Sequence, residues 1–295
     1  ILNDGVLTIV NSSVRNNQAS DGGGIQNNEQ LTVKNSTIRN NTVAVSGGGI
    51  YNDDSLYVKN STISRNTYSE PFTTGGGIYN DVFLFVENST ISENQASDFG
   101  GGIYNFNGNV NLHHTIVAKN TAPDGGSDGY NDGGNIDASS SYNIIGKNSN
   151  FGVPGGNDNK IDVSPIIGPL VDNGGPTETH ALQCGSPAYN AGDPALNTPD
   201  QRGESVFADT IDIGAFEAQD NLMMFSNDVH SVTNTQDSGS GSLRRAVLNA
   251  CPGDTIAFDP GIDGDTIFLS SGQILLNKDL VLLGNGSSNT LLDAN

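Results

Sequence analysis

The sequence LTVKNSTIRNN at residues 31–41, followed by GGGIYN at residues 47–52, decides the fold because the chain repeats it. Related copies stand at residues 7–17 with 22–27, at 56–66 with 75–80 and at 84–94 with 100–105, and a degenerate fifth copy, NLHHTIVAKN, stands at 111–120. The Ile after each glycine triplet falls at residues 25, 50, 78 and 103. A fixed period of roughly 20–50 residues is typical of a solenoid.

Each repeat contains two short stretches that alternate as β-strands do. In LTVK, Leu31 and Val33 point to one face while Thr32 and Lys34 point to the other. Leucine-rich repeats have a similar period, but they carry a denser leucine frame and a helical segment, and neither pattern occurs in these repeats. We therefore predict an all-β fold, a right-handed parallel β-helix with coils of about 25 residues stacked ~4.8 Å apart.

Stacking places equivalent residues of successive coils above one another. Two apolar ladders should fill the interior, namely Val14, Ile38, Ile63, Ile91 and Val117, and Ile25, Ile50, Ile78 and Ile103. A structural ladder of turn asparagines should hydrogen-bond from coil to coil, namely Asn17, Asn41, Asn66, Asn94 and Asn120. The glycine triplets mark backbone that needs positive φ or a close approach between coils.

The composition narrows the classes of partner. The formal net charge is −21 and the pI is near 4.1. This charge disfavours nucleic acid and anionic membrane surfaces, because binding phosphate needs clustered Lys and Arg. It makes Ca²⁺ a candidate cofactor. The sequence has no run of 18 apolar residues, so we expect no membrane insertion.

The two cysteines, Cys184 and Cys251, allow two interpretations. They can form a disulfide with each other. Each also suits a small buried apolar position, and the strong tendency of free cysteine to be buried favours this second interpretation.

Punctuation by Gly, Pro and Asp divides the chain into four regions. Residues 1–120 are predicted to form the β-helix coils, and residues 121–217 irregular terminal coils and a cap over the exposed end of the solenoid. Residues 218–231 have the composition of a linker. Residues 232–295 should contain a short helix at 241–250 and further coils, with strand-like runs at 266–269, 273–276, 280–283 and 290–292.

Several motifs resemble known families. The alternation of GGGIYN with TIxxN resembles the repeats of the polymorphic outer-membrane proteins, with Ile in place of Phe. GPLVDNGGPTETHAL (168–182), GSPAYNAGD (185–193) and DIGAFE (212–217) are similar to the choice-of-anchor Q domain of bacterial surface β-helix proteins. VTNTQDSGSGSLRRAV (232–247), followed by GDTIAF (253–258), resembles their CSLREA-like start motif, with Gly241 in place of the namesake Cys. The resemblance covers nearly the whole chain and implies a secreted or surface-displayed β-helix, usually without enzymatic activity.

The order of these motifs differs from that of the families, because the start motif follows the Q-like region. We interpret the chain as one period of a tandem array or filament, or as a permuted subunit. In this interpretation its partners are copies of itself, joined head to tail through residues 232–295 and the first coils. Open solenoid ends expose unpaired strand edges, and such edges favour this pairing.

Three sets of side chains are candidate sites. The stretch that contains Asp124, Asp128, Asp132 and Asp137 supplies oxygen ligands for Ca²⁺, although the spacing is not that of an EF-hand, and the alternative is a solvated polar loop. The stripe Tyr51, Tyr79 and Tyr104 should face outward and could bind glycan or a neighbouring fibre, unless tyrosine merely suits a strand surface. Glu29, Asp54 and Asp81 could stack as the carboxylate pair of a glycosidase, but a solvated acidic edge is the preferred interpretation.

These observations predict an extracellular or cell-surface structural or adhesive module, a building block of a fibre or tandem array. We assign no catalytic residues and no cofactor other than a possible Ca²⁺. The alternative is a polysaccharide lyase or glycoside hydrolase on the same scaffold. The sequons at Asn11, Asn35, Asn60 and Asn88 arise from the repeat and imply glycosylation only in a host that modifies them.

Overall fold

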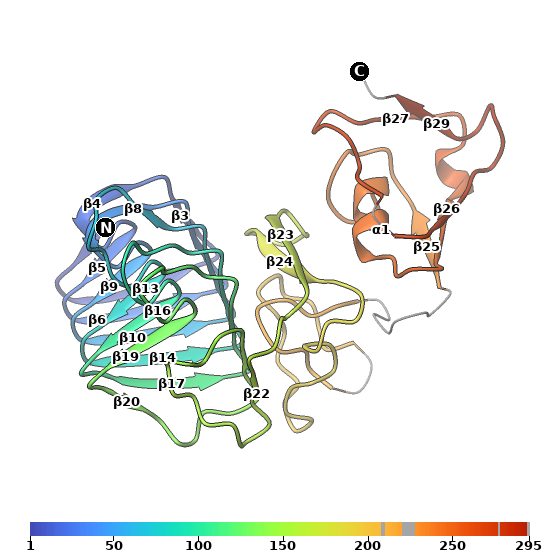
Figure 1. Cartoon of the computed structure of the whole chain (residues 1–295). Helices are drawn as coiled ribbons and strands as arrows, with labels where there is room; N and C mark the ends of the chain where they lie inside the picture. The colour runs from blue at the N-terminus through green and yellow to red at the C-terminus, as the bar shows by residue number, and fades with distance from the viewer. Residues whose placement is uncertain (208–209, 220–227, 277, 294–295) are drawn as a thin grey trace.

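Figure 1 shows the computed structural model, in which the strands of the first 161 residues stack as parallel coils. The structure describes residues 1–207, 210–219, 228–276 and 278–293. Within these ranges the protein is almost entirely β, with a single α-helix, α1 (Leu243–Asn249), and one short 3-10 helix (Pro260–Ile262). The predicted parallel β-helix is confirmed.

Three parallel sheets form the sides of the coils, and a short fourth sheet covers one corner. The first sheet consists of β1 (Leu2–Asn3), β5 (Ile25–Asn27), β9 (Ile50–Asn52), β13 (Ile78–Asn80), β16 (Ile103–Phe106) and β19 (Gly129–Asp132). The second consists of β2 (Val6–Val10), β6 (Gln30–Lys34), β10 (Ser55–Lys59), β14 (Phe83–Glu87), β17 (Asn109–His113) and β20 (Asn135–Ile136). The third consists of β3 (Ser13–Arg15), β7 (Thr37–Arg39), β11 (Thr62–Ser64), β15 (Thr90–Ser92), β18 (Ile116–Ala118), β21 (Ile144–Ile145) and β22 (Lys160–Ile161), and the fourth of β4 (Gln18–Asp21), β8 (Thr42–Ser46) and β12 (Thr67–Tyr68).

The register between coils follows the repeat. Gln26 pairs with Tyr51, Tyr51 with Tyr79, Tyr79 with Tyr104 and Tyr104 with Tyr130. Successive coils therefore advance by 25, 28, 25 and 26 residues. The longer coil carries the insertion around residues 69–73, which leaves the strands as a loop with Phe72 exposed.

The core is a narrow column of stacked aliphatic side chains. Ile38, Ile63 and Ile91 are in register and fully buried, and so are Ile50, Ile78 and Ile103 in the first sheet. Both predicted apolar ladders are thus present, and Leu31, Leu56 and Leu84 add a third from the second sheet. Like-on-like stacking keeps the core dry and uniform along the axis.

The turn asparagines form a continuous chain of side-chain hydrogen bonds inside the solenoid. Nδ2 of Asn41 donates to Oδ1 of Asn66, and Nδ2 of Asn66 donates to Oδ1 of Asn94, each over 2.9 Å. The same bond joins Asn17 to Asn41 and Asn94 to Asn120. Each inner amide also accepts from the backbone N–H of its neighbour and donates to a carbonyl, so the buried Asn66 amide is paired on both sides.

A second asparagine ladder, which the sequence analysis missed, ends the strands of the first sheet. Side-chain amides donate to side-chain carbonyls over 2.6–2.8 Å along Asn3, Asn27, Asn52, Asn80, Asn105 and Asn131. The signal was the invariant Asn that closes each GGGIxN motif. Two parallel amide ladders therefore hold the coils in register.

The glycine triplets serve both of the predicted purposes. Gly47 has φ +73°, and a Cβ there would meet the Ile50 carbonyl oxygen at 2.6 Å. Gly49 has ordinary φ, but a Cβ there would lie 2.6 Å from the Gly77 carbonyl oxygen of the next coil. The first glycine permits the turn, and the third permits the close approach of coils.

The region predicted as an end cap mostly covers the side of the solenoid instead. We call residues 163–207 and 210–219 the flank segment. It includes the antiparallel hairpin β23 (Ile167–Val171) and β24 (Thr179–Leu182). Threonine hydroxyls on the outer face of the third sheet bind it: Thr37 donates to the Glu178 carbonyl and Thr62 to the Gln201 side chain, each over 2.7 Å. The hydroxyl groups on the outer face of that sheet therefore find partners within the protein. A cap placed over the end of the solenoid would leave these hydroxyl groups exposed to water.

Only a short stretch closes the end of the core. Phe151 and Val153 are almost fully buried and belong to the main hydrophobic cluster. The Phe151 ring lies over Gly129, where a Cβ would meet ring carbons at 2.3 Å. The ring of Phe151 therefore covers the end of the hydrophobic core. The coils extend beyond residue 120 as far as β22.

The C-terminal unit, residues 228–276 and 278–293, forms two small parallel sheets beside α1. They are β25 (Val229–Val232), β26 (Thr255–Phe258) and β28 (Val281–Leu283), and β27 (Thr266–Phe268) with β29 (Leu291–Asp293). The predicted helix is present, with Ser242 as its N-cap. The run 273–276 does not form a strand, and the second unit begins with β25 rather than at 232. Most of the predicted linker, residues 220–227, lies outside the described residues.

A disulfide joins the flank segment to this unit. Cys184 and Cys251 are bonded, with their Cα atoms 5.2 Å apart. The interpretation of two free buried cysteines is therefore wrong. Sequence reasoning weighed each cysteine alone, whereas the pairing depends on two segments that are 67 residues apart meeting in space.

The amide ladder makes a direct prediction about stability. Replacing Asn66 by Ala should lower the free energy of unfolding by about 2–4 kcal/mol, because the amide and side-chain donors of Asn41 lose their acceptor inside the solenoid. The matched control is Asn17→Ala at the exposed end of the ladder, which should cost less than about 1 kcal/mol. Urea unfolding followed by circular dichroism measures both free energies. An equal loss of stability in the two variants would contradict a stabilising role of the buried hydrogen bonds.

Candidate functional site

The tyrosine stripe lies on the outer side of the first sheet and has a fourth member, Tyr130. Its rings stack face to face, with centroids 4.8 Å apart for Tyr51 and Tyr79, 5.4 Å for Tyr79 and Tyr104, and 5.7 Å for Tyr104 and Tyr130. Tyr104 is only 8% exposed. The faces of the inner rings are occupied by each other, so a sugar has no free ring face there on which to stack.

Carboxylates run alongside this stripe. The Tyr104 hydroxyl donates to Oδ2 of Asp132 over 2.6 Å, and burial together with this bond raises the pKa of Tyr104. Burial and the neighbouring Asp53 raise the pKa of Asp81. The stripe therefore presents phenol edges and carboxylates to solvent.

The predicted acidic trio is not in register. Asn52 pairs with Asn80, so Asp53 and Asp81 occupy equivalent positions, whereas Asp54 is level with Glu29. The same offset is visible in the sequence, because Asp81 comes one place earlier after Ile78 than Asp54 does after Ile50. The alignment leaves no run of three carboxylates, and the trio does not support a glycosidase.

The four aspartates proposed as calcium ligands do not converge. Asp128 is buried and caps the asparagine ladder, since its Oδ1 accepts from both the backbone and the side chain of Asn120. Asp132 binds the Tyr104 hydroxyl, and Asp137 accepts from the hydroxyl and N–H of Ser139. Among the residues that the structure describes, no three His, Cys, Asp or Glu side chains are grouped to hold a metal ion.

A serine–histidine pair lies between the third sheet and the flank segment. Oγ of Ser64 is 2.9 Å from Nε2 of His180, whose Nδ1 bonds to the Gly168 carbonyl oxygen. The pair has the outline of a hydrolase dyad, but Ser64 is fully buried and His180 is 1% exposed. No substrate reaches it, and its role is to dock the flank segment.

The sequence DQRG at residues 200–203 and the motif DIGAFE (212–217) form the buried polar centre of the flank segment. Arg202 pairs with Asp200 over 2.8 Å and lies 3.8 Å from the centre of the Phe216 ring. Asp212 accepts from the backbone N–H groups of Asn190 and Ala218, and Glu217 accepts from the N–H of Asp212. Burial, and next the charge of Glu217, raise the pKa of Asp212 to about 8. These motifs hold an irregular segment together and form no open site.

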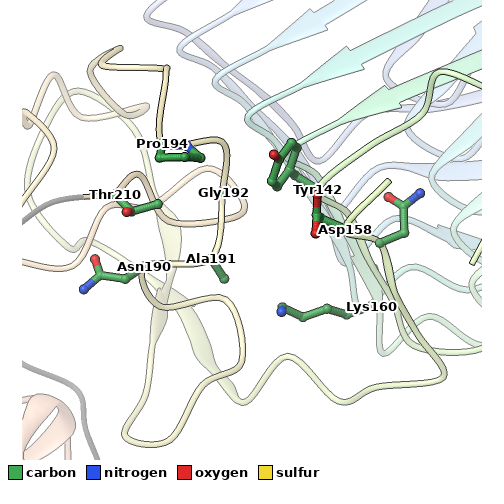
Figure 2. Close-up of a pocket in the computed structure, with 9 residues that line it drawn as sticks. Tyr142, Asp158, Lys160, Asn190, Ala191, Gly192, Pro194 and Thr210 are labelled. Carbon is green, nitrogen blue, oxygen red and sulfur yellow. The ribbon is translucent and has the colours of Figure 1, made fainter. Parts of the chain in front are cut away.

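Figure 2 shows a polar cavity of about 460 Å³ where the last coil meets the flank segment. Tyr142, Asp158 and Lys160 line it from the coil, and Ala191 and Thr210 are among the residues on the flank side. The Tyr142 ring stacks on the buried ring of His114, with centroids 5.1 Å apart.

Three of the four sequons are sterically restricted. Nδ2 of Asn60 donates to the Pro199 carbonyl and Nδ2 of Asn88 to the Thr198 hydroxyl, while Oδ1 of Asn35 is buried. Of these four, Asn11 on the first coil is the exposed one.

Comparison with known families identifies the repeat. Residues 35–53 and 88–105 match the model of the Chlamydia polymorphic membrane protein repeat. Each match runs from the Asn of NST through the GGGIY motif. No curated protein and no solved structure matches the chain. None of the described helices has the length and apolar character needed to span a membrane.

Asp128 gives the solenoid a testable pH dependence. Burial raises its pKa from 3.8 to about 6. A carboxyl whose pKa is raised on folding stabilises the fold fully below its unfolded pKa and loses that contribution as pH rises through the folded pKa. From pH 4 to pH 8, wild type should lose roughly 2–3 kcal/mol of stability relative to Asp128→Asn.

The measurement is urea unfolding of both proteins at several pH values. Asp124→Asn is the control, because Asp124 is exposed in the same loop. If the stability of wild type and that of Asp128→Asn changed with pH in parallel, the raised pKa of the buried Asp128 carboxyl would be contradicted.

Proposed function

We propose that this protein is an extracellular structural or adhesive module whose copies join head to tail along the solenoid axis. The observation that carries the proposal is the pair of bare apolar edges. In the first coil, β2 has one neighbour, β6, and Leu2, Val6 and Val10 are 61%, 80% and 44% exposed. In the C-terminal unit, β28 has one neighbour, β26, and Val281, Leu282 and Leu283 are 53%, 43% and 58% exposed.

The two edges have compatible geometry. Strands of the C-terminal unit advance by 26 residues from Thr255 to Val281 and by 25 from Thr266 to Leu291, close to the spacing of the coils. Both edges belong to parallel sheets, so a neighbouring copy can add its strands in the same direction. Such an interface is heterologous, and repeating it yields an open filament.

Two further findings support an extracellular setting. The repeat model that residues 35–53 and 88–105 match is described as that of the Chlamydia polymorphic membrane proteins. The disulfide between Cys184 and Cys251 is of the kind that persists in oxidising compartments. Adhesion needs no catalytic residues, and no observation favours the lyase or glycoside hydrolase alternative.

The assembly is tested with one variant at each edge. Val6→Lys and Leu283→Lys should each prevent concentration-dependent association in sedimentation velocity, because a charge replaces an apolar contact at an edge strand. The matched control is Phe72→Lys, since Phe72 is 79% exposed but lies in the insertion loop away from both edges. It should assemble like wild type and show the same filaments by electron microscopy.

Mixing the two edge variants sharpens the test. Each retains one intact edge, so an equimolar mixture of Val6→Lys and Leu283→Lys should form dimers but no filaments. A wild type that stays monomeric at all concentrations, or edge variants that assemble as well as Phe72→Lys, would refute the head-to-tail proposal.

A further inference from the structure

The tyrosine stripe on the first sheet is a group of oxidisable side chains for which head-to-tail assembly has no use. Four of the eight tyrosines of the chain stack there. The rings of Tyr51 and Tyr79 form the closest pair, with centroids 4.8 Å apart and planes inclined by only 5°. This separation equals the spacing of neighbouring strands, so the register of the coils itself brings the two phenols together.

Tyr51 and Tyr79 also have more freedom to move than the rings that follow them. Both are half-buried, whereas Tyr104 is 8% exposed and its hydroxyl donates to Asp132 over 2.6 Å. Tyr51 is the end of the stack, because the preceding coil carries Gln26 at the paired position. The Tyr51 ring can therefore turn against Tyr79 without displacing another ring of the stripe.

Carboxylates beside the two phenols can accept their protons. Burial, and next the charges of Asp53 and Asp81, raise the pKa of Tyr51. Burial, and next the neighbouring Tyr51 and the same two carboxylates, raise the pKa of Tyr79. Both hydroxyls therefore keep their protons at neutral pH, and removing an electron from either ring also requires the release of a proton. The negative charge of the carboxylates favours the loss of that electron.

We propose that Tyr51 and Tyr79 are a site of oxidative cross-linking, at which hydrogen peroxide and a haem peroxidase join two successive coils by a dityrosine bond. Each phenol loses one electron and one proton, and the two radicals form a bond between one Cε atom of each ring. The hydrogen on each of these carbons then moves to the phenolic oxygen, which restores both hydroxyl groups. The two electrons and two protons reduce one hydrogen peroxide to two water molecules.

The cross-link would strengthen the longest coil of the repeat region. Tyr51 lies on β9 and Tyr79 on β13, so the bond closes the 28-residue coil that carries the insertion around residues 69–73. Closing a loop lowers the conformational entropy of the unfolded chain and so stabilises the folded one. Both tyrosines belong to one chain, and the reaction therefore does not depend on head-to-tail assembly.

The test is oxidation of the full chain with hydrogen peroxide and a haem peroxidase, followed by dityrosine fluorescence. Mass spectrometry of proteolytic fragments should place the link between Tyr51 and Tyr79. Tyr51→Phe and Tyr79→Phe should each lose this product, although phenylalanine keeps a ring in the stack. Tyr57→Phe is the matched control, because Tyr57 on the second sheet contacts the rings of Phe83 and Phe85 and should not contribute to the product.

A second control lies inside the stripe. Tyr104→Phe removes a phenol that is stacked on Tyr79 but held by Asp132, and it should leave the yield of the Tyr51–Tyr79 product unchanged. Absence of dityrosine in wild type would overturn the proposal. Wild-type yield of dityrosine in Tyr51→Phe, or loss of the product in Tyr104→Phe, would overturn the assignment to this pair.

Isotope labelling separates the cross-link from contacts between copies. Chains labelled with light and with heavy nitrogen are mixed in equal amounts and then oxidised. Every cross-linked Tyr51–Tyr79 fragment should be entirely light or entirely heavy, and mixed fragments would contradict a bond within one chain. The oxidised wild type should also unfold at a midpoint at least about 5 °C above that of oxidised Tyr51→Phe, and equal midpoints would contradict the stabilising role.

Discussion

The rest of the molecule depends on one constraint: equivalent residues of successive parallel coils must lie directly above one another. A buried turn leaves amides and carbonyls that water cannot reach, and each must find a partner inside the protein. Here two columns of asparagine side chains supply those partners, and each amide serves the coils above and below it. A shift of one coil by one residue would break both columns and turn the aliphatic ladders outward.

This constraint limits which side chains can meet on the outside of the coils. Stacked rows present the same side chain at each level, so tyrosines meet tyrosines and their ring faces are consumed by one another. Carboxylates on the coils meet hydroxyls, other carboxylates or the basic side chains of the neighbouring coil. Two cavities occur where the repeat stops, at the flank segment and the C-terminal unit, because unlike segments face each other there.

The flank segment shows how an irregular chain is accommodated on a regular one. The third sheet offers a ladder of threonine hydroxyls at Thr37, Thr62 and Thr90, and loop carbonyls and amides bind them in turn. Buried charges within the segment, centred on Arg202 and Asp200, hold its loops together. The disulfide between Cys184 and Cys251 then links the segment to the C-terminal unit a second time, in addition to the backbone.

The sequence by itself determined the coils. The period, the alternation in LTVK and the recurrent asparagines predicted the β-helix, its interior ladders and helix α1, because those features depend on residues near one another in a repeat. Only the tertiary structure decided the position of the flank segment, the pairing of Cys184 with Cys251 and the separation of the four aspartates. Each of these depends on how segments without a shared period meet in space, and local sequence carries no record of such contacts.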